Sequence, residues 1–244
     1  MLNRGIKIVC FFGVILFSDL RAQEKVITAG FQFRPIFSNA FFKTGSAGTE
    51  QDGVDFTISP QYSYCFGMVV RRGITPNISA ESAINFTKRS YHLTITDGAF
   101  KGESDFSITG YEVPFQGLVF IKLNKFIYMD VASGISLDFF PVDLFITREI
   151  SYYENKIIRR TWVLPGLLAN VGWEYRTPKK GYFYFGASYH RPFAPIYRSQ
   201  IGYHSSAKSD IVSIKLSGNY LTADIRYFFN EKPVKKKKKK GDAK

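Results

Sequence analysis

The chain has 244 residues, of which 17% are aromatic, and a formal net charge of +13. This length fits one substantial domain or two small ones, and the aromatic content is high for a soluble globular protein. The charge is concentrated at the ends: residues 230–244 hold eight lysines against two acids (+6) and residues 1–22 carry +2, which leaves +5 on residues 23–229. The basic balance therefore does not indicate a nucleic-acid-binding domain, and no nucleic-acid partner is expected.

Residues 1–22 have the three parts of a secretory signal. A basic stretch, MLNRGIK, precedes ten apolar residues, IVCFFGVILF, and a short polar run that ends on the small residue Ala22. Ten apolar residues are too few to cross a bilayer as a helix. We expect a signal peptide over residues 1–22 that is cleaved before Gln23. The mature chain would keep Cys65 as its single cysteine and form no internal disulfide.

Alternating residues over 54–70 predict one strand of seventeen residues, whose even positions are mainly apolar or aromatic and whose odd positions are mainly polar. Such a strand is longer than the ~9–11 residues that a tilted strand needs to cross a membrane. In residues 78–95 the apolar positions change from even (Ile84, Phe86) to odd (Leu93, Ile95), which predicts a β-bulge. Together with 54–70 and 78–95, six more strands are expected, at residues 25–36, 106–123, 126–139, 160–175, 181–191 and 213–229.

The connections between these eight strands alternate in length. Long connections are expected at residues 37–53, 96–105, 140–159 and 192–212, and short ones at 71–77, 124–125 and 177–181. An even strand number with alternating short turns and long loops is typical of outer-membrane barrels. The predicted fold class is all-β, an eight-stranded antiparallel up-and-down transmembrane β-barrel with both termini periplasmic. It would occupy residues 23–229, ahead of a disordered lysine-rich periplasmic tail over residues 230–244.

Two soluble folds remain as alternatives: a lipocalin-like barrel and an extracellular β-sandwich, which also contain alternating strands. The polar face of the predicted strands contains charges, and such side chains suit a narrow interior in which opposite charges pair. This pattern favours the membrane barrel. The charges predicted to face the interior are Asp55, Glu112, Lys122, Asp130, Asp138, Glu174, Asp224 and Arg226.

The last strand resembles the C-terminal assembly signal of bacterial outer-membrane barrels, in which alternate hydrophobic positions end on an aromatic residue. Those positions here are Leu221, Ala223, Ile225, Tyr227 and Phe229. With the signal peptide and the strand pattern, the chain resembles the small outer-membrane β-barrel proteins of Bacteroidota of the PorT-like kind. The resemblance implies an accessory or structural subunit of an outer-membrane secretion or assembly machinery. Fifteen residues follow Phe229, whereas the signal usually closes the chain.

Catalytic and metal motifs are weak in this sequence. The three histidines lie far apart with no standard ligand spacing, and no cofactor is expected. His204 and Ser206, with Asp210 as a possible orienting acid, resemble the motif of eight-stranded lipid A deacylases, although that motif lies on a strand in the family and here falls in a predicted loop. A lipid A-modifying hydrolase is therefore one alternative, and a surface adhesin is another.

An eight-stranded barrel is just wide enough for side chains, so a diffusion pore is not expected. The sequence favours a non-enzymatic barrel in the outer membrane of a Gram-negative bacterium, which contacts outer-membrane lipids and other outer-membrane or periplasmic subunits. Two predicted loops are rich in aromatic residues of the kind found at interfaces, either as β-hairpin extensions or as contact surfaces. The candidate external contacts are Phe145, Tyr152, Tyr153 and Tyr197. The candidate periplasmic contacts are Lys235, Lys236, Lys237, Lys238, Lys239 and Lys240.

Overall fold

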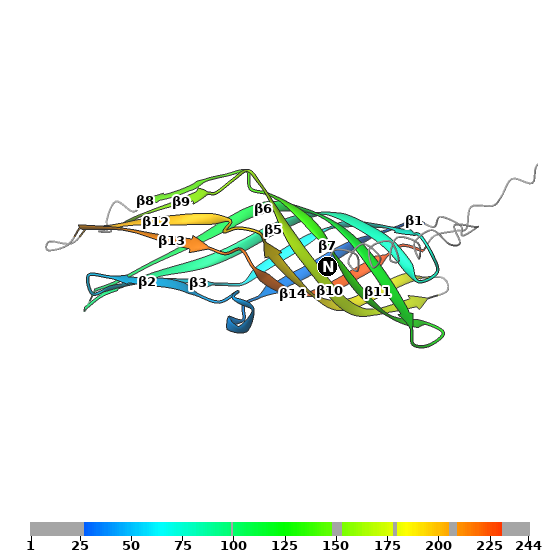
Figure 1. Cartoon of the computed structure of the whole chain (residues 1–244). Helices are drawn as coiled ribbons and strands as arrows, with labels where there is room; N and C mark the ends of the chain where they lie inside the picture. The colour runs from blue at the N-terminus through cyan, green and yellow to red at the C-terminus, as the bar shows by residue number, and fades with distance from the viewer. Residues whose placement is uncertain (1–26, 99, 148–152, 178–179, 205–208, 231–244) are drawn as a thin grey trace, which may run out of the picture.

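The computed structural model describes residues 27–98, 100–147, 153–177, 180–204 and 209–230 (Figure 1). The predicted signal peptide and the six tail lysines lie outside these residues. No helix in the described part of the chain is long and apolar enough to span a membrane. The elements are β1 (Ile27–Phe37), η1 (Ala40–Phe42), β2 (Ala47–Gln51), β3 (Val54–Pro60), β4 (Ser63–Gly73), β5 (Ile78–Asp97), β6 (Phe100–Lys122), β7 (Ile127–Phe139), β8 (Leu144–Thr147), β9 (Tyr153–Arg159), β10 (Val163–Thr177), β11 (Gly181–Pro192), β12 (Tyr197–His204), β13 (Ser209–Leu216) and β14 (Tyr220–Phe228).

Eight strands form a closed antiparallel ring in the order β1, β4, β5, β6, β7, β10, β11, β14. The ring closes where the first strand pairs with the last, with Gly30 opposite Phe228. Because β1 begins where β14 ends, both ends of the described chain lie at one end of the barrel. The prediction of an eight-stranded antiparallel barrel is confirmed.

The outer face of the ring is apolar around its circumference. Ile84, Met68 and Phe185 are 66%, 57% and 55% exposed, although large apolar side chains normally avoid water. Aromatic pairs lie near both ends of the belt: Phe31 packs on Phe229 with ring centroids 5.5 Å apart, and Phe42 on Tyr189 at 5.4 Å. An apolar belt between aromatic girdles is the lipid-facing surface of a transmembrane barrel in an outer membrane. The short β4–β5 and β6–β7 turns lie at the same end as the termini, which is the periplasmic end in barrels of this kind.

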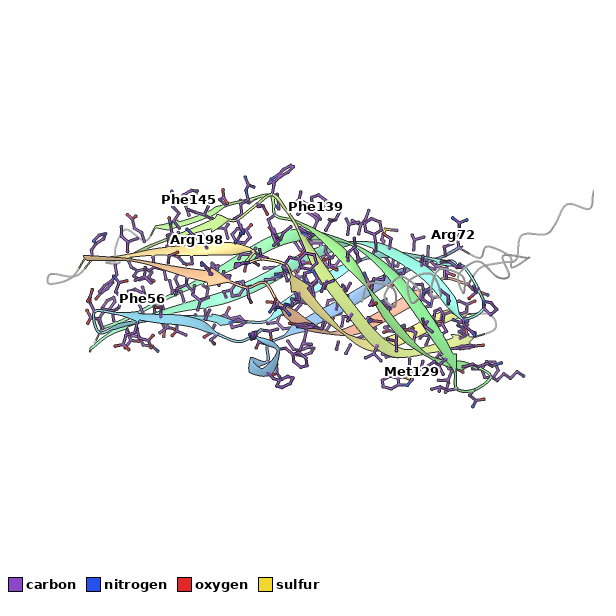
Figure 2. The ribbon with its side chains drawn as sticks, viewed as in Figure 1. Phe56, Arg72, Met129, Phe139, Phe145 and Arg198 are labelled. Atoms are coloured by element: carbon purple, nitrogen blue, oxygen red, sulfur yellow. The ribbon has the colours of Figure 1, made fainter. Side chains whose placement is uncertain are left out.

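The strands continue beyond the end of the barrel opposite the termini and form a second structure, here called the head (Figure 1). One head sheet consists of β2, β3 and the distal parts of β5 and β6, and the other of β13, β12, β9 and β8. Between them lies the largest apolar core of the described chain, which includes Phe56, Ile95, Ile108, Ile157 and Ile201. Figure 2 shows Phe56, Phe145 and Arg198 in the head, and Met129 and Arg72 along the barrel.

The side chains that face inward change character between the barrel and the head. Along β5 the odd positions face inward on both sides of the change: Asn85 and Arg89 are buried in the barrel, and Leu93 and Ile95 are buried in the head. The β5–β6 register is the same on both sides of this change. The predicted bulge in residues 78–95 is therefore wrong. The apolar positions shift because the barrel has lipid outside and a polar lumen inside, whereas the head has water outside and an apolar core inside.

A bulge does occur in the partner of β5, so the predicted strand over residues 54–70 is two strands. Pro60 lies opposite Tyr91 and Tyr64 opposite Lys88, which leaves one extra residue on the β3–β4 side. The extra residue changes which side chains face inward, so that even positions face the head core in β3 and lipid in β4. For this reason Asp55 is exposed rather than interior. Lys122, at the end of β6, is exposed as well.

Three further expectations are corrected. Residues 192–212 are not one long loop, because they contain β12 and the start of β13. Residues 96–105 are not a long loop, because β5 and β6 pair up to Asp97 opposite Phe100, next to Gly98 with a φ of 57°. The segment 213–229 is not one strand: β13 belongs to the head and β14 to the barrel, separated near Gly218, which has a φ of 75°. Asp52 and Gly53, both with positive φ, form the two-residue turn of the β2–β3 hairpin within the predicted loop 37–53.

A hydrogen bond from the Tyr153 hydroxyl links the two head sheets at β6. Tyr153 on β9 donates a hydrogen bond of 2.7 Å to the backbone carbonyl of Glu103 on β6. Tyr153→Phe removes this bond and is expected to lower the local stability of the head by about 1 kcal/mol. Hydrogen exchange of the β5–β6 hairpin amides measures the effect. Tyr62→Phe, at an exposed position, is the matched control; equal exchange in both variants would contradict the role of Tyr153.

Candidate functional site

The barrel lumen is crossed by ion pairs between strands on opposite sides of the ring. Arg71 on β4 pairs with Glu174 on β10, four strands away around the ring. Arg34 on β1 donates to Glu112 on β6 at 3.0 Å, three strands away around the ring. All four side chains are almost fully buried. Side chains that span the diameter fill the lumen, as the strand number requires.

Further lumen groups connect these pairs into one network. Arg226 on β14 contacts Glu81 at 2.6 Å and Asp224 at 2.7 Å, and Arg34 also reaches Asp224 at 3.3 Å. Asn170 donates to the second oxygen of Asp224 at 2.9 Å. Each carboxylate in this chain of contacts thus faces an arginine, which offsets the cost of burying the charge.

Aromatic rings and arginines form a layer at the periplasmic end of the lumen. The guanidinium of Arg71 lies 4.2 Å from the ring centroid of Phe228 and 5.2 Å from that of Phe120. Arg176 lies 4.0 Å from the centroid of Tyr128. These cation–π contacts close the end of the barrel at which the described chain begins and ends.

The fold brings together three groups that can ligate metals, which the sequence spacing did not indicate. Ligand atoms of Glu112, Asp138 and His190 all lie within 4.8 Å of one another, and all three residues are buried. Glu112, however, accepts hydrogen bonds from Arg34 and Tyr220, and Nε2 of His190 lies 2.8 Å from Oγ of Ser136. A metal ion there would displace these contacts and lie beside an arginine, so the cluster fits a polar packing role better.

A cavity of about 400 Å³ lies where the head joins the barrel, here called the junction cavity. Its wall is formed by the segment after β1, the β3–β4 bulge, the middle of β5 and the β13–β14 connection. Apolar side chains line part of it, including Ile58 and Leu216, and six serine or threonine residues line another part. Its charged lining residues are Lys43, Arg89 and Lys215, and no aspartate or glutamate is among the described residues that line it. The sequence patterns did not indicate this cavity, because four separate segments form it.

The predicted external contacts differ in position. Phe145 on β8 is 67% exposed and available to a partner. Tyr153 and Tyr197 are buried in the head core, which corrects the expectation for these two residues, while Tyr152 lies outside the described residues. Burial raises the pKa of Tyr197 to about 12, so its hydroxyl keeps its proton and donates to the carbonyl of Val142 at 2.7 Å. The loop 140–159 forms the predicted hairpin extension as β8 and β9.

The assembly-signal positions lie on β14 and directly after it, on the face opposite the lumen. Ile225 and Phe229 are 48% and 43% exposed, and Leu221, Ala223 and Tyr227 are half-buried beside their neighbours. Of the possible catalytic group, His204 is exposed at the end of β12. Ser206 and the side chain of Asp210 lie outside what the structure describes.

The fold, the apolar belt and the filled lumen define this chain as an outer-membrane β-barrel. The outer membrane protein OprG from Pseudomonas aeruginosa has a similar structure, with a TM-score of 0.52 at 12% identity over 84% of this chain and 95% of that chain. The outer membrane protease OmpT from Escherichia coli has a TM-score of 0.38 at 11% identity, over 86% and 100% of the two chains. No family model and no curated protein matches the chain, and the PorT-like resemblance stays a prediction.

Proposed function

We propose that this protein is a non-enzymatic subunit of an outer-membrane protein complex, in which the barrel is the anchor and the head binds the partner. The observation that carries the proposal is the contrast between the two parts. Ion pairs cross the lumen of the barrel, which disfavours transport through it. The head, in contrast, is a folded unit with its own apolar core, at the end of the barrel opposite the periplasmic termini.

The free edge of β8 is the proposed contact surface. This strand ends the head sheet in the described structure, so its outer backbone groups can pair with a strand of another protein. Phe145 projects from β8, and its exposed ring supplies apolar contact area beside the edge. On the periplasmic side, Asn230 ends the described chain at the opposite end of the barrel, from which Lys235–Lys240 would meet a periplasmic subunit or the anionic lipid surface.

Affinity purification from a mild detergent tests the proposal. We expect a partner to copurify in a fixed ratio, and Phe145→Asp to lower its recovery by about tenfold or more, since a charge at a central apolar contact is costly. Thr49→Asp, an exposed change in the other head sheet, is the matched control and should leave recovery unchanged. If no partner copurifies in a fixed ratio, the subunit function is wrong, and a surface adhesin becomes the better explanation.

A lipid A-modifying hydrolase is the second candidate on the sequence spacing of His204 and Ser206, although His204 ends β12 at the tip of the head, away from the lipid-facing belt. Its test is separate. Purified protein should release no acyl chain from lipid A, and any release that Ser206→Ala abolishes would overturn the non-enzymatic function.

A further inference from the structure

Arg89 differs from the other buried arginines of the described structure. Arg34, Arg71 and Arg226 each lie within 4.0 Å of one or more carboxylates, whereas Arg89, only 6% exposed, has none within that distance. Its polar partners among the described residues are neutral: the carbonyl of Gly218, at 3.0 Å, and the hydroxyl of Tyr91. A buried cation without a counter-charge in direct contact is costly, so a site of this kind favours an anion.

The guanidinium is held at the wall of the junction cavity. It lies 4.7 Å from the ring centroid of Tyr220, which restricts its orientation, and both residues line the cavity. On its lumen side, Arg89 shares a separate space of only about 10 Å³ with Glu112 and Asp138, enough for about one water molecule. The negative charges of these two carboxylates therefore attract the Arg89 guanidinium through space, without an ion pair in direct contact.

The rest of the cavity defines the other features of a ligand. Exposed Lys43 and Lys215 add positive charge at the wall, and no described lining residue is acidic. Ile58, Pro60 and Leu216 present apolar surface, and serine and threonine hydroxyls lie between. A volume of about 400 Å³ lies within the usual range for small-molecule sites. Both lysines are exposed, so the cavity is reached from the aqueous side.

We propose that the junction cavity binds a small organic carboxylate with an apolar body, whose carboxylate pairs with Arg89 while its apolar part packs against Ile58 and Leu216. Arginine matches a carboxylate with two parallel hydrogen bonds, which a lysine cannot reproduce. This site is separate from the partner surface on β8, because no β8 residue lines the cavity and Lys215 and Leu216 lie on β13, at the opposite edge of that sheet.

Isothermal titration of the protein in lipid nanodiscs with octanoate tests the site. We expect saturable binding with one site per chain, no saturable binding of neutral 1-octanol at the same concentrations, and a loss of affinity of about tenfold or more in Arg89→Gln. Arg72→Gln, an exposed change at the periplasmic end, is the matched control and should bind as the unchanged protein does.

Two outcomes would overturn the proposal: equal binding of octanol and octanoate, or unchanged octanoate affinity in folded Arg89→Gln protein. If Arg89→Gln does not fold, Ser46→Trp decides, because it fills the cavity from an exposed lining position without changing any charge. The Ser46→Trp protein should then bind no octanoate. If it binds octanoate with unchanged affinity, the ligand site is not the junction cavity and the proposal is wrong.

Discussion

Arg34→Met is expected to lower the free energy of unfolding by about 3–5 kcal/mol, the cost of removing one partner from a buried ion pair. The arginine contacts Glu112 at 3.0 Å and Asp224 at 3.3 Å inside the lumen, so its loss leaves buried negative charge with less compensation. Urea titration of the protein in lipid vesicles, followed by tryptophan fluorescence, measures the change. Arg72→Met, at an exposed position of the same barrel, should change stability by less than about 0.5 kcal/mol.

A double-mutant cycle shows whether this loss comes from the ion pair itself. Glu112→Gln removes the charge that Arg34 compensates, so the double variant should be more stable than the sum of the single effects predicts, by about 1–3 kcal/mol. Additive single effects would mean that the Arg34–Glu112 pair carries little energy and that the loss in Arg34→Met comes from its other contacts, such as Asp224.

Ile84→Arg is expected to cost about 2–4 kcal/mol, the usual penalty for an arginine on the lipid face near the middle of a barrel. Ile84 is 66% exposed on β5, which in water would make the change nearly neutral. Thr96→Arg is the control because it lies on the outer face of the same strand, in the head. It should cost less than about 0.5 kcal/mol. Similar costs at both positions would contradict a membrane belt that ends below the head.

The barrel was predictable from the sequence because alternation over many residues has one structural cause. On β10, Leu167 and Trp173 face lipid while Asn170 and Glu174 face the lumen, and each neighbour repeats this contrast. Strand number, direction and the lipid face follow from that pattern. The head is not predictable in the same way, because alternation shows that the two faces of a strand differ and does not show which face is buried. Leu93 and Ile95 fit a lipid-facing pattern, but they are buried in the head core.

Two local signals could have identified the head hairpins. Asp52-Gly53 and Asp97-Gly98 are dipeptides typical of tight hairpin turns, and both lie inside segments that were expected to be long loops. The pairing of lumen charges has no such local signal. Arg34 and Asp224 are 190 positions apart in the sequence, and Arg71 falls in a segment predicted to be a turn. Their contacts follow from ring closure and the strand register.

The most direct measurement of the central claim, that the barrel carries the head on the outside of the cell, is cysteine labelling on intact cells. Native Cys65 is buried, so single cysteines can be introduced without a strong background. Phe145→Cys in the head should react with a membrane-impermeant maleimide on intact cells. Asn124→Cys, in the turn at the other end of the barrel, should react only after the outer membrane is opened. Labelling of Asn124→Cys but not Phe145→Cys on intact cells would contradict this topology.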